Sequence, residues 1–168
     1  MQTDLSSLLG WLEATRLAEF MRVSAWAFPT VESIHVIALA LVVGTIAIVD
    51  LRLLGLASAH RPYAEVAREV LPLTWSAFAV AVVAGTLMFV SQPTGYFANF
   101  AFRMKILLLL LAGFNMLVFQ LITGRNCATW DPARATPLPG KIAGTLSLAF
   151  WVAVVFFGRR IGFTMSPV

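Results

Sequence analysis

The chain has 168 residues, of which 60% are hydrophobic and only 12% are charged, with a formal net charge of +4. Soluble domains contain about 25% charged residues, so this composition excludes an ordinary soluble domain and predicts one integral membrane domain over residues 1–168. The basic residues lie between apolar runs, where they indicate lipid headgroup contacts rather than nucleic acid, and the single cysteine excludes an intrachain disulfide.

Residues 4–26 predict an amphipathic helix that lies in the membrane interface. Leucines recur at helical spacing in its first half, and charged residues three apart follow on another face. Trp11 and Trp26 are expected at the depth of the lipid headgroups. A soluble helix that caps the bundle is the alternative for this segment.

Four apolar runs follow, each about 20 residues long, which is the length that a membrane-spanning helix needs. They cover residues 29–54, 71–90, 99–122 and 141–158. Pro29 and Pro72 are expected in first helical turns, and Gly55 is expected to end the first span. Short connections between the runs predict an all-α, up-down-up-down four-helix bundle.

Small residues on the second run predict close helix packing. Ala77, Ala81 and Gly85 repeat every four residues, so they share one face and allow another backbone to approach closely. The partner is a helix of the same bundle or of a second copy in a homo-oligomer.

The basic residues give a prediction of orientation, because an even number of spans places both termini on one side. Each side carries six lysines and arginines. If Arg103 and Lys105 are embedded functional groups, the count becomes four against six. The positive-inside rule then favours termini on the outer, periplasmic side.

His35 is the main candidate site residue, since no other side chain between Ser33 and Val49 can carry a charge. Ionisable residues within a span usually face protein or a site. At 1.5 Å per residue His35 lies about 9 Å inside the first span, and Lys105 lies at a matching depth in the third. Glu32 is one turn from His35. We therefore predict that His35 and Lys105 approach within about 10 Å of each other.

The helical wheel separates Lys105 from Arg103, because two residues are about 200° apart. Lys105 shares its face with Ala112 and Met116 and lies nearer Asn115, whereas Arg103 shares its face with leucines and Phe114. Lys105 is therefore expected to point inward, and Arg103 to reach the headgroups.

Three interpretations of His35 stay open on the residues alone. An imidazole near cationic groups suits haem, with the nitrogen on iron and a lysine or arginine paired with propionates. A copper(I) site would combine His35 with methionines, chosen from Met88, Met104 and Met116. In a purely structural interpretation His35 and Glu32 hydrogen-bond each other and pin two helices.

At the opposite end Asp50 is interpreted as a structural anchor that pairs with Arg125 or Lys141.

Four stretches resemble an uncharacterised family of small bacterial four-span proteins. They are residues 32–44, 50–55, 102–105 and 147–162. More distantly, the layout is similar to HemJ-type protoporphyrinogen oxidases and CopD-like copper-resistance proteins. The HemJ-type enzymes bind haem b and have a histidine early in one helix and a lysine at the start of a later one. The resemblance implies that His35 and Lys105 match these residues, while Asn115 stands where that family has a further histidine.

These observations together predict a haem b-binding redox protein of the bacterial inner membrane. His35 would be the iron ligand, with Lys105, Glu32 and Asn115 in the cofactor site. The protein would transfer electrons or act on a membrane-soluble substrate, with lipid around it and a homo-oligomeric or redox partner in the membrane. A non-catalytic scaffold or a copper-handling subunit is the alternative, so the sequence leaves open whether the chain is an enzyme.

Overall fold

The computed structural model describes residues 2–58, 60–123 and 136–165, and every regular element in these ranges is helical. Four helices are long and apolar enough to cross a membrane. They are α3 (Ala27–Leu54), α4 (Tyr63–Ser91), α6 (Phe100–Val118) with its π-helical continuation η1 (Phe119–Thr123), and α7 (Leu138–Thr164). The predicted all-α, multi-pass membrane architecture is confirmed.

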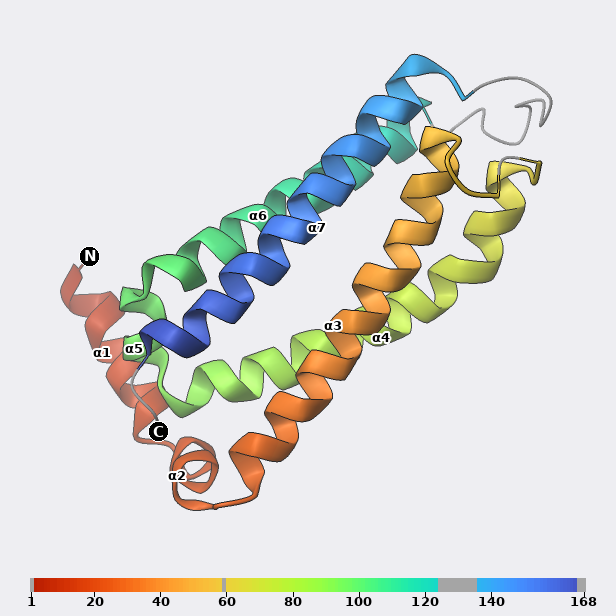
Figure 1. Cartoon of the computed structure of the whole chain (residues 1–168). Helices are drawn as coiled ribbons and strands as arrows, with labels where there is room; N and C mark the ends of the chain where they lie inside the picture. The colour runs from red at the N-terminus through yellow and green to blue at the C-terminus, as the bar shows by residue number, and fades with distance from the viewer. Residues whose placement is uncertain (1, 59, 124–135, 166–168) are drawn as a thin grey trace.

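Three shorter helices gather at the end of the bundle where α3 and α6 begin and α4 and α7 end (Figure 1). They are α1 (Gln2–Glu13), α2 (Arg16–Val23) and α5 (Pro93–Ala98). Many large apolar side chains of the four long helices are exposed, which is the surface expected of helices that face lipid.

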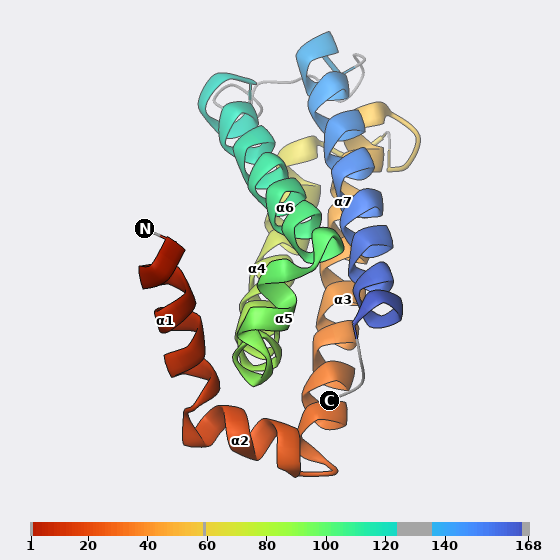
Figure 2. The same cartoon turned by 90° about the vertical axis from the view of Figure 1, so that its left-hand side faces the viewer.

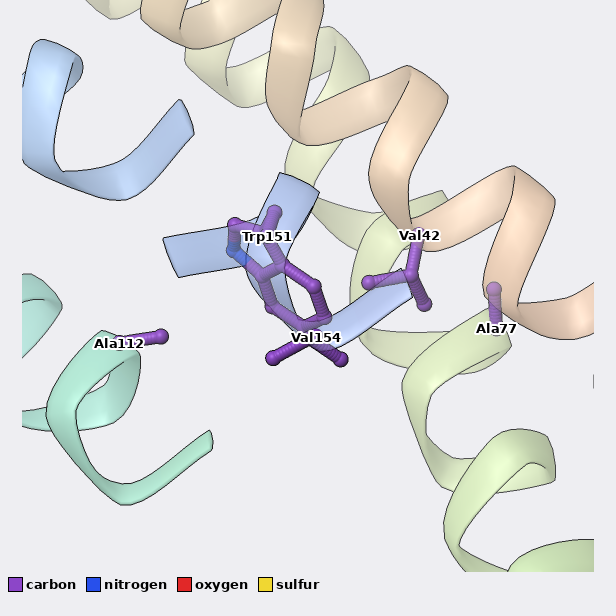
Figure 3. Close-up of a cluster of buried hydrophobic side chains, with 5 residues drawn as sticks. All are labelled: Val42, Ala77, Ala112, Trp151 and Val154. Carbon is purple, nitrogen blue, oxygen red and sulfur yellow. The ribbon is translucent and has the colours of Figure 1, made fainter. Parts of the chain in front are cut away.

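The long helices form two pairs, α3 with α4 and α6 with α7, which are joined where α3 contacts α7. By contrast, the backbones of α4 and α6 lie farther apart, and side chains such as the stacked rings of Phe89 and Phe102 bridge the two helices. At the centre Trp151 and Val154 of α7 pack in one buried cluster with a residue from each other helix: Val42, Ala77 and Ala112 (Figure 3).

The N-terminal segment differs from the single helix predicted over residues 4–26. It forms two helices, because Thr15 interrupts the first and caps the second by accepting a hydrogen bond from the Ala18 amide at 3.3 Å. Figure 2 shows α2 crossing the end of the bundle. Arg22 fixes it there by donating to the Ser91 carbonyl of α4 at 2.8 Å and to the Glu13 carbonyl at 3.0 Å.

The helix boundaries also extend beyond the predicted ones. The prediction that Pro72 lies in a first turn is wrong, since α4 begins at Tyr63 and contains Pro72 in its interior. Arg61 pairs with Glu65 and Glu69 at 2.6 and 2.7 Å, which ties the polar start of α4 together. At its other end α7 continues to Thr164, past the predicted residue 158. Gly55 ends α3 in the left-handed conformation (φ 77°), as predicted.

The small-residue face of α4 packs within the bundle, which confirms one of its two predicted partners. Ala77 and Ala81 are buried, and α4 makes its most extensive contact with α3. Gly85 lies directly against the His35 ring: a Cβ atom built on Gly85 would be 3.0 Å from His35 Cε1. This face of α4 therefore seats the imidazole.

Candidate functional site

The His35 side chain reaches from α3 to the backbone of α4. Its Nδ1 atom is 2.8 Å from the Ala81 carbonyl oxygen. A carbonyl only accepts hydrogen bonds, so Nδ1 carries a proton and donates it. This bond fixes the ring orientation and directs Nε2 away from α4, which leaves Nε2 as the atom available for chemistry.

Lys105 faces that atom from α6. Its Nζ is 3.4 Å from His35 Nε2, a long hydrogen bond in which the lysine donates. The lysine also lies against Gly158 of α7, where a built Cβ would be 3.5 Å from Nζ. The predicted approach of His35 and Lys105 is confirmed, and all four long helices contribute to the place where they meet.

The face of α6 was also predicted correctly. Lys105 is half-buried beside His35, whereas Arg103 is exposed. The ammonium group has three N–H donors. Within the described residues only the bond to His35 uses one, and no acidic side chain forms an ion pair with Lys105. The pair is therefore cationic or neutral, without a fixed counter-charge.

Glu32 does not take the partner role that the structural interpretation gave it. It is exposed, and His35 Nδ1 is engaged by Ala81 instead, so the predicted hydrogen bond between His35 and Glu32 is wrong. The charge of Glu32 is instead the smaller of two influences on Tyr96 of α5. Burial, and secondarily the negative charge of Glu32, raise the pKa of the Tyr96 hydroxyl to about 12.

Asn115 is not brought to His35. Its Nδ2 donates to the Ala143 carbonyl at 3.0 Å and so bridges α6 to α7. Asn115 is ten residues from Lys105 on one helix, about 15 Å along the axis. Asn115 therefore lies at another depth than the His35–Lys105 pair, and its role in a cofactor site stays a prediction.

A second polar location, which we call the Asp50 cavity, lies near the opposite end of the bundle. It has a volume of about 250 Å³ and is lined from all four long helices. Asp50 of α3 is 5% exposed, accepts a hydrogen bond from Ser147 of α7, and has no partner for its Oδ2 atom. The predicted partner Arg125 lies outside the described residues, and no ion pair joins Asp50 to Lys141.

Sequence reasoning gave Asp50 only an anchoring role. The available signal was an acidic residue at the end of an apolar run, which is equally typical of a helix terminus at the membrane surface. Its burial in a cavity depends on α7 approaching α3 closely at Gly144, where a built Cβ would be 3.2 Å from the Asp50 carbonyl oxygen.

The comparisons with known proteins identify a family. A sequence model described as a family of unknown function, DUF6644, matches residues 8–164, which include all four long helices. The chain belongs to the DUF6644 family. No curated protein and no solved structure matches it. The predicted membership of an uncharacterised family is thus confirmed, whereas these comparisons show no similarity to HemJ-type or CopD-like proteins.

The site of this DUF6644 protein fits haem in one respect and not in another. A histidine that donates Nδ1–H to a backbone carbonyl and presents Nε2 is arranged as metal-ligating histidines are. However, Lys105 stands 3.4 Å in front of Nε2, and neither residue lines the Asp50 cavity. As arranged, the pair does not fit a macrocycle between His35 and Lys105. Among the described residues there is also no cluster of three His, Cys, Asp or Glu side chains for a metal ion.

Proposed function

We propose that this DUF6644 protein carries out proton transfer within the membrane, with His35 and Lys105 as a pair that donates and accepts one proton. The observation that carries the proposal is the approach of Lys105 Nζ to His35 Nε2 in a chain that spans the membrane. Ionisable residues inside transmembrane segments typically mark proton relays or substrate paths.

The hydrogen bonds determine which ring nitrogen takes part in the transfer. Nδ1 is held by Ala81, so a proton enters and leaves the ring at Nε2. Proton transfer breaks one N–H bond of the Lys105 ammonium and forms one on Nε2, which converts ammonium and neutral imidazole into amine and imidazolium. Because lysine has a flexible stem, a shift of a few tenths of an ångström brings the 3.4 Å separation into the usual hydrogen-bond range.

The proton acceptor or donor beyond the pair is a membrane-soluble substrate or a redox partner in the membrane. Two further N–H donors of Lys105 are available to such a group in the described structure.

We place the protein in the bacterial inner membrane with its termini on the periplasmic side, which puts His35 and Lys105 nearer the periplasm. The uneven basic residues support this orientation once Arg103 and Lys105 are set aside.

Nuclear magnetic resonance of protein labelled with ¹⁵N-histidine tests the proposal, since the chain has two histidines and His60 is an exposed reference. We expect His35 to show the Nδ1–H tautomer and to exchange a proton at Nε2 as pH changes. Lys105→Ala should change the pH at which this exchange occurs, because it removes the group bonded to Nε2. Arg103→Ala is the matched control and should leave it in place. An unchanging His35 signal over the pH range in which the protein stays folded contradicts proton transfer.

Haem b binding at His35 is a second candidate, favoured by a ring whose Nδ1–H is held by a backbone carbonyl, as in metal-ligating histidines. When bound, haem would supply one-electron chemistry. It requires Lys105 to leave the front of Nε2 and pair with an anionic group. Purified protein would then show a Soret band that His35→Ala abolishes and Lys105→Ala weakens, with a smaller effect from Arg103→Ala. A colourless protein after expression with haem supplied rejects this candidate. Copper handling and a scaffold role have no specific observation in their favour.

A further inference from the structure

The Asp50 cavity is chemically distinct from the His35–Lys105 pair. At 1.5 Å per residue, Asp50 and His35 are about 22 Å apart along α3. The lining of the cavity is mostly apolar and aromatic, and among the described residues that line it Asp50 is the only ionisable acid or base apart from the phenol of Tyr63. No lysine, arginine or histidine within residues 2–58, 60–123 and 136–165 lines it. The cavity therefore combines apolar surface with a single carboxyl group.

Neighbouring residues hold Asp50 in place, but one of its two carboxyl oxygens has no hydrogen-bond partner. Ser147 donates to it from α7, and the close approach of α3 and α7 at Gly144 fixes the backbone beneath it. Its Oδ2 atom is buried without a hydrogen-bond partner. A buried carboxyl oxygen without a partner is costly, and a donor group in the cavity would remove that cost.

The nearest arginine in the sequence does not supply that donor. Arg52 is buried, but its Nε donates to the Arg61 carbonyl at 2.6 Å and its Nη1 contacts Thr136 Oγ1 at 3.5 Å. Residues two apart on a helix point about 160° away from each other, so Arg52 faces the loop side while Asp50 faces the cavity.

Aromatic side chains from two helices surround the remaining space. Trp75 and Phe78 of α4 form an edge-to-face pair with ring centroids 6.0 Å apart, and Trp151 lines the cavity from α7. Aromatic faces attract organic cations as well as apolar groups. Tyr63 of α4 and Phe119 of η1, whose ring centroids are 5.6 Å apart, line the cavity as well.

We propose that the Asp50 cavity binds a membrane-soluble organic cation, an amine whose ammonium group donates to Asp50 and whose apolar body lies against Trp75, Phe78 and Trp151. The buried, unpartnered oxygen of Asp50, with no base among the described lining residues, selects a cation over an anion. The volume of about 250 Å³ admits a body about the size of one substituted aromatic ring. This inference does not depend on proton transfer at His35.

Three probes of similar shape and different charge distinguish recognition of the ammonium group from nonspecific partitioning of an apolar molecule into the protein or detergent. They are 2-phenylethylamine, which is an ammonium ion at neutral pH, the neutral 2-phenylethanol and the anionic phenylacetate. Binding to the purified, detergent-solubilised full chain is measured by isothermal titration calorimetry. We expect the ammonium ion to bind at least about tenfold more tightly than the alcohol, as a charged hydrogen bond to a buried partner implies, and the anion not to bind.

Asp50→Asn should remove the preference for the ammonium ion and leave alcohol binding unchanged. Ala143→Leu fills the cavity from α7 and should weaken both probes, whereas Ala149→Leu, at an exposed position of the same helix, should weaken neither. If Asp50→Asn does not fold, binding of the ammonium ion and the alcohol to the Ala143 and Ala149 variants still tests whether the ammonium ion binds in the Asp50 cavity. Equal binding of ammonium ion and alcohol to the unaltered protein, or ammonium binding unaffected by Ala143→Leu, overturns the proposal.

Discussion

One backbone atom fixes the orientation of the His35 imidazole. The Ala81 carbonyl holds Nδ1–H at 2.8 Å, so Nε2 alone faces Lys105. Gly85 is the residue that makes this possible, because any side chain there would lie where the ring now lies. The reactive pair thus depends on a residue that carries no functional group.

Gly85→Leu should displace the His35 ring and destabilise the protein. Overfilling a packed position typically costs about 1–3 kcal/mol, and the ring has no free space on the α4 side. Thermal unfolding measures the loss, and the ¹⁵N signals of His35 should change with it.

Gly44→Leu is the matched control, since Gly44 is an exposed position of α3 where a built Cβ meets nothing within 4 Å. Equal melting temperatures for the Gly44 and Gly85 variants would contradict the packing that we describe.

At the scale of elements, α2 is held to the bundle by a polar side chain as well as by apolar packing. Ala18 and Met21 are buried against the bundle end, and Arg22 links α2 to the last carbonyl of α4 and to the last residue of α1. The N-terminal helices therefore form a defined part of the fold at the same end as His35.

Arg22→Ala should loosen α1 and α2 while the four long helices stay folded. Two hydrogen bonds from a charged donor are lost, and each such bond contributes about 1.5–3 kcal/mol. Hydrogen exchange followed by mass spectrometry should show faster exchange in residues 2–23. Arg16→Ala, at an exposed position of the same helix, should not; comparable exchange in the two variants would mean that Arg22 does not hold the cap.

At the scale of the whole molecule, the four long helices do not pack equally against one another. They form two pairs, and the contact between α3 and α7 joins the pairs. Trp151 and Val154 of α7 fill the space between the pairs. The Asp50 cavity remains on one side of this cluster, and the His35–Lys105 pair lies on the other. The buried cluster thereby separates two polar locations within a single bundle.

Trp151→Ala should be among the most destabilising single changes in the chain. Large-to-small substitutions of a buried aromatic residue cost about 3–5 kcal/mol, because the space left behind collapses only in part. Melting of the detergent-solubilised protein measures the effect. Phe114→Ala removes an aromatic ring that is 65% exposed and should change the melting temperature little. A similar response to both substitutions would place the core elsewhere.

The sequence alone determined the four spans, the face of Lys105 and the meeting of Lys105 with His35. These features follow from apolar run length and from the fixed rise and rotation of a helix, which are local properties. Only the tertiary structure decided that Ala81 rather than Glu32 binds His35 Nδ1, that Asn115 binds α7, that Thr15 divides the N-terminal helix, and that Asp50 lies in a cavity. Each of these depends on which neighbouring helix a side chain meets, and helix periodicity assigns a face without naming the partner across it.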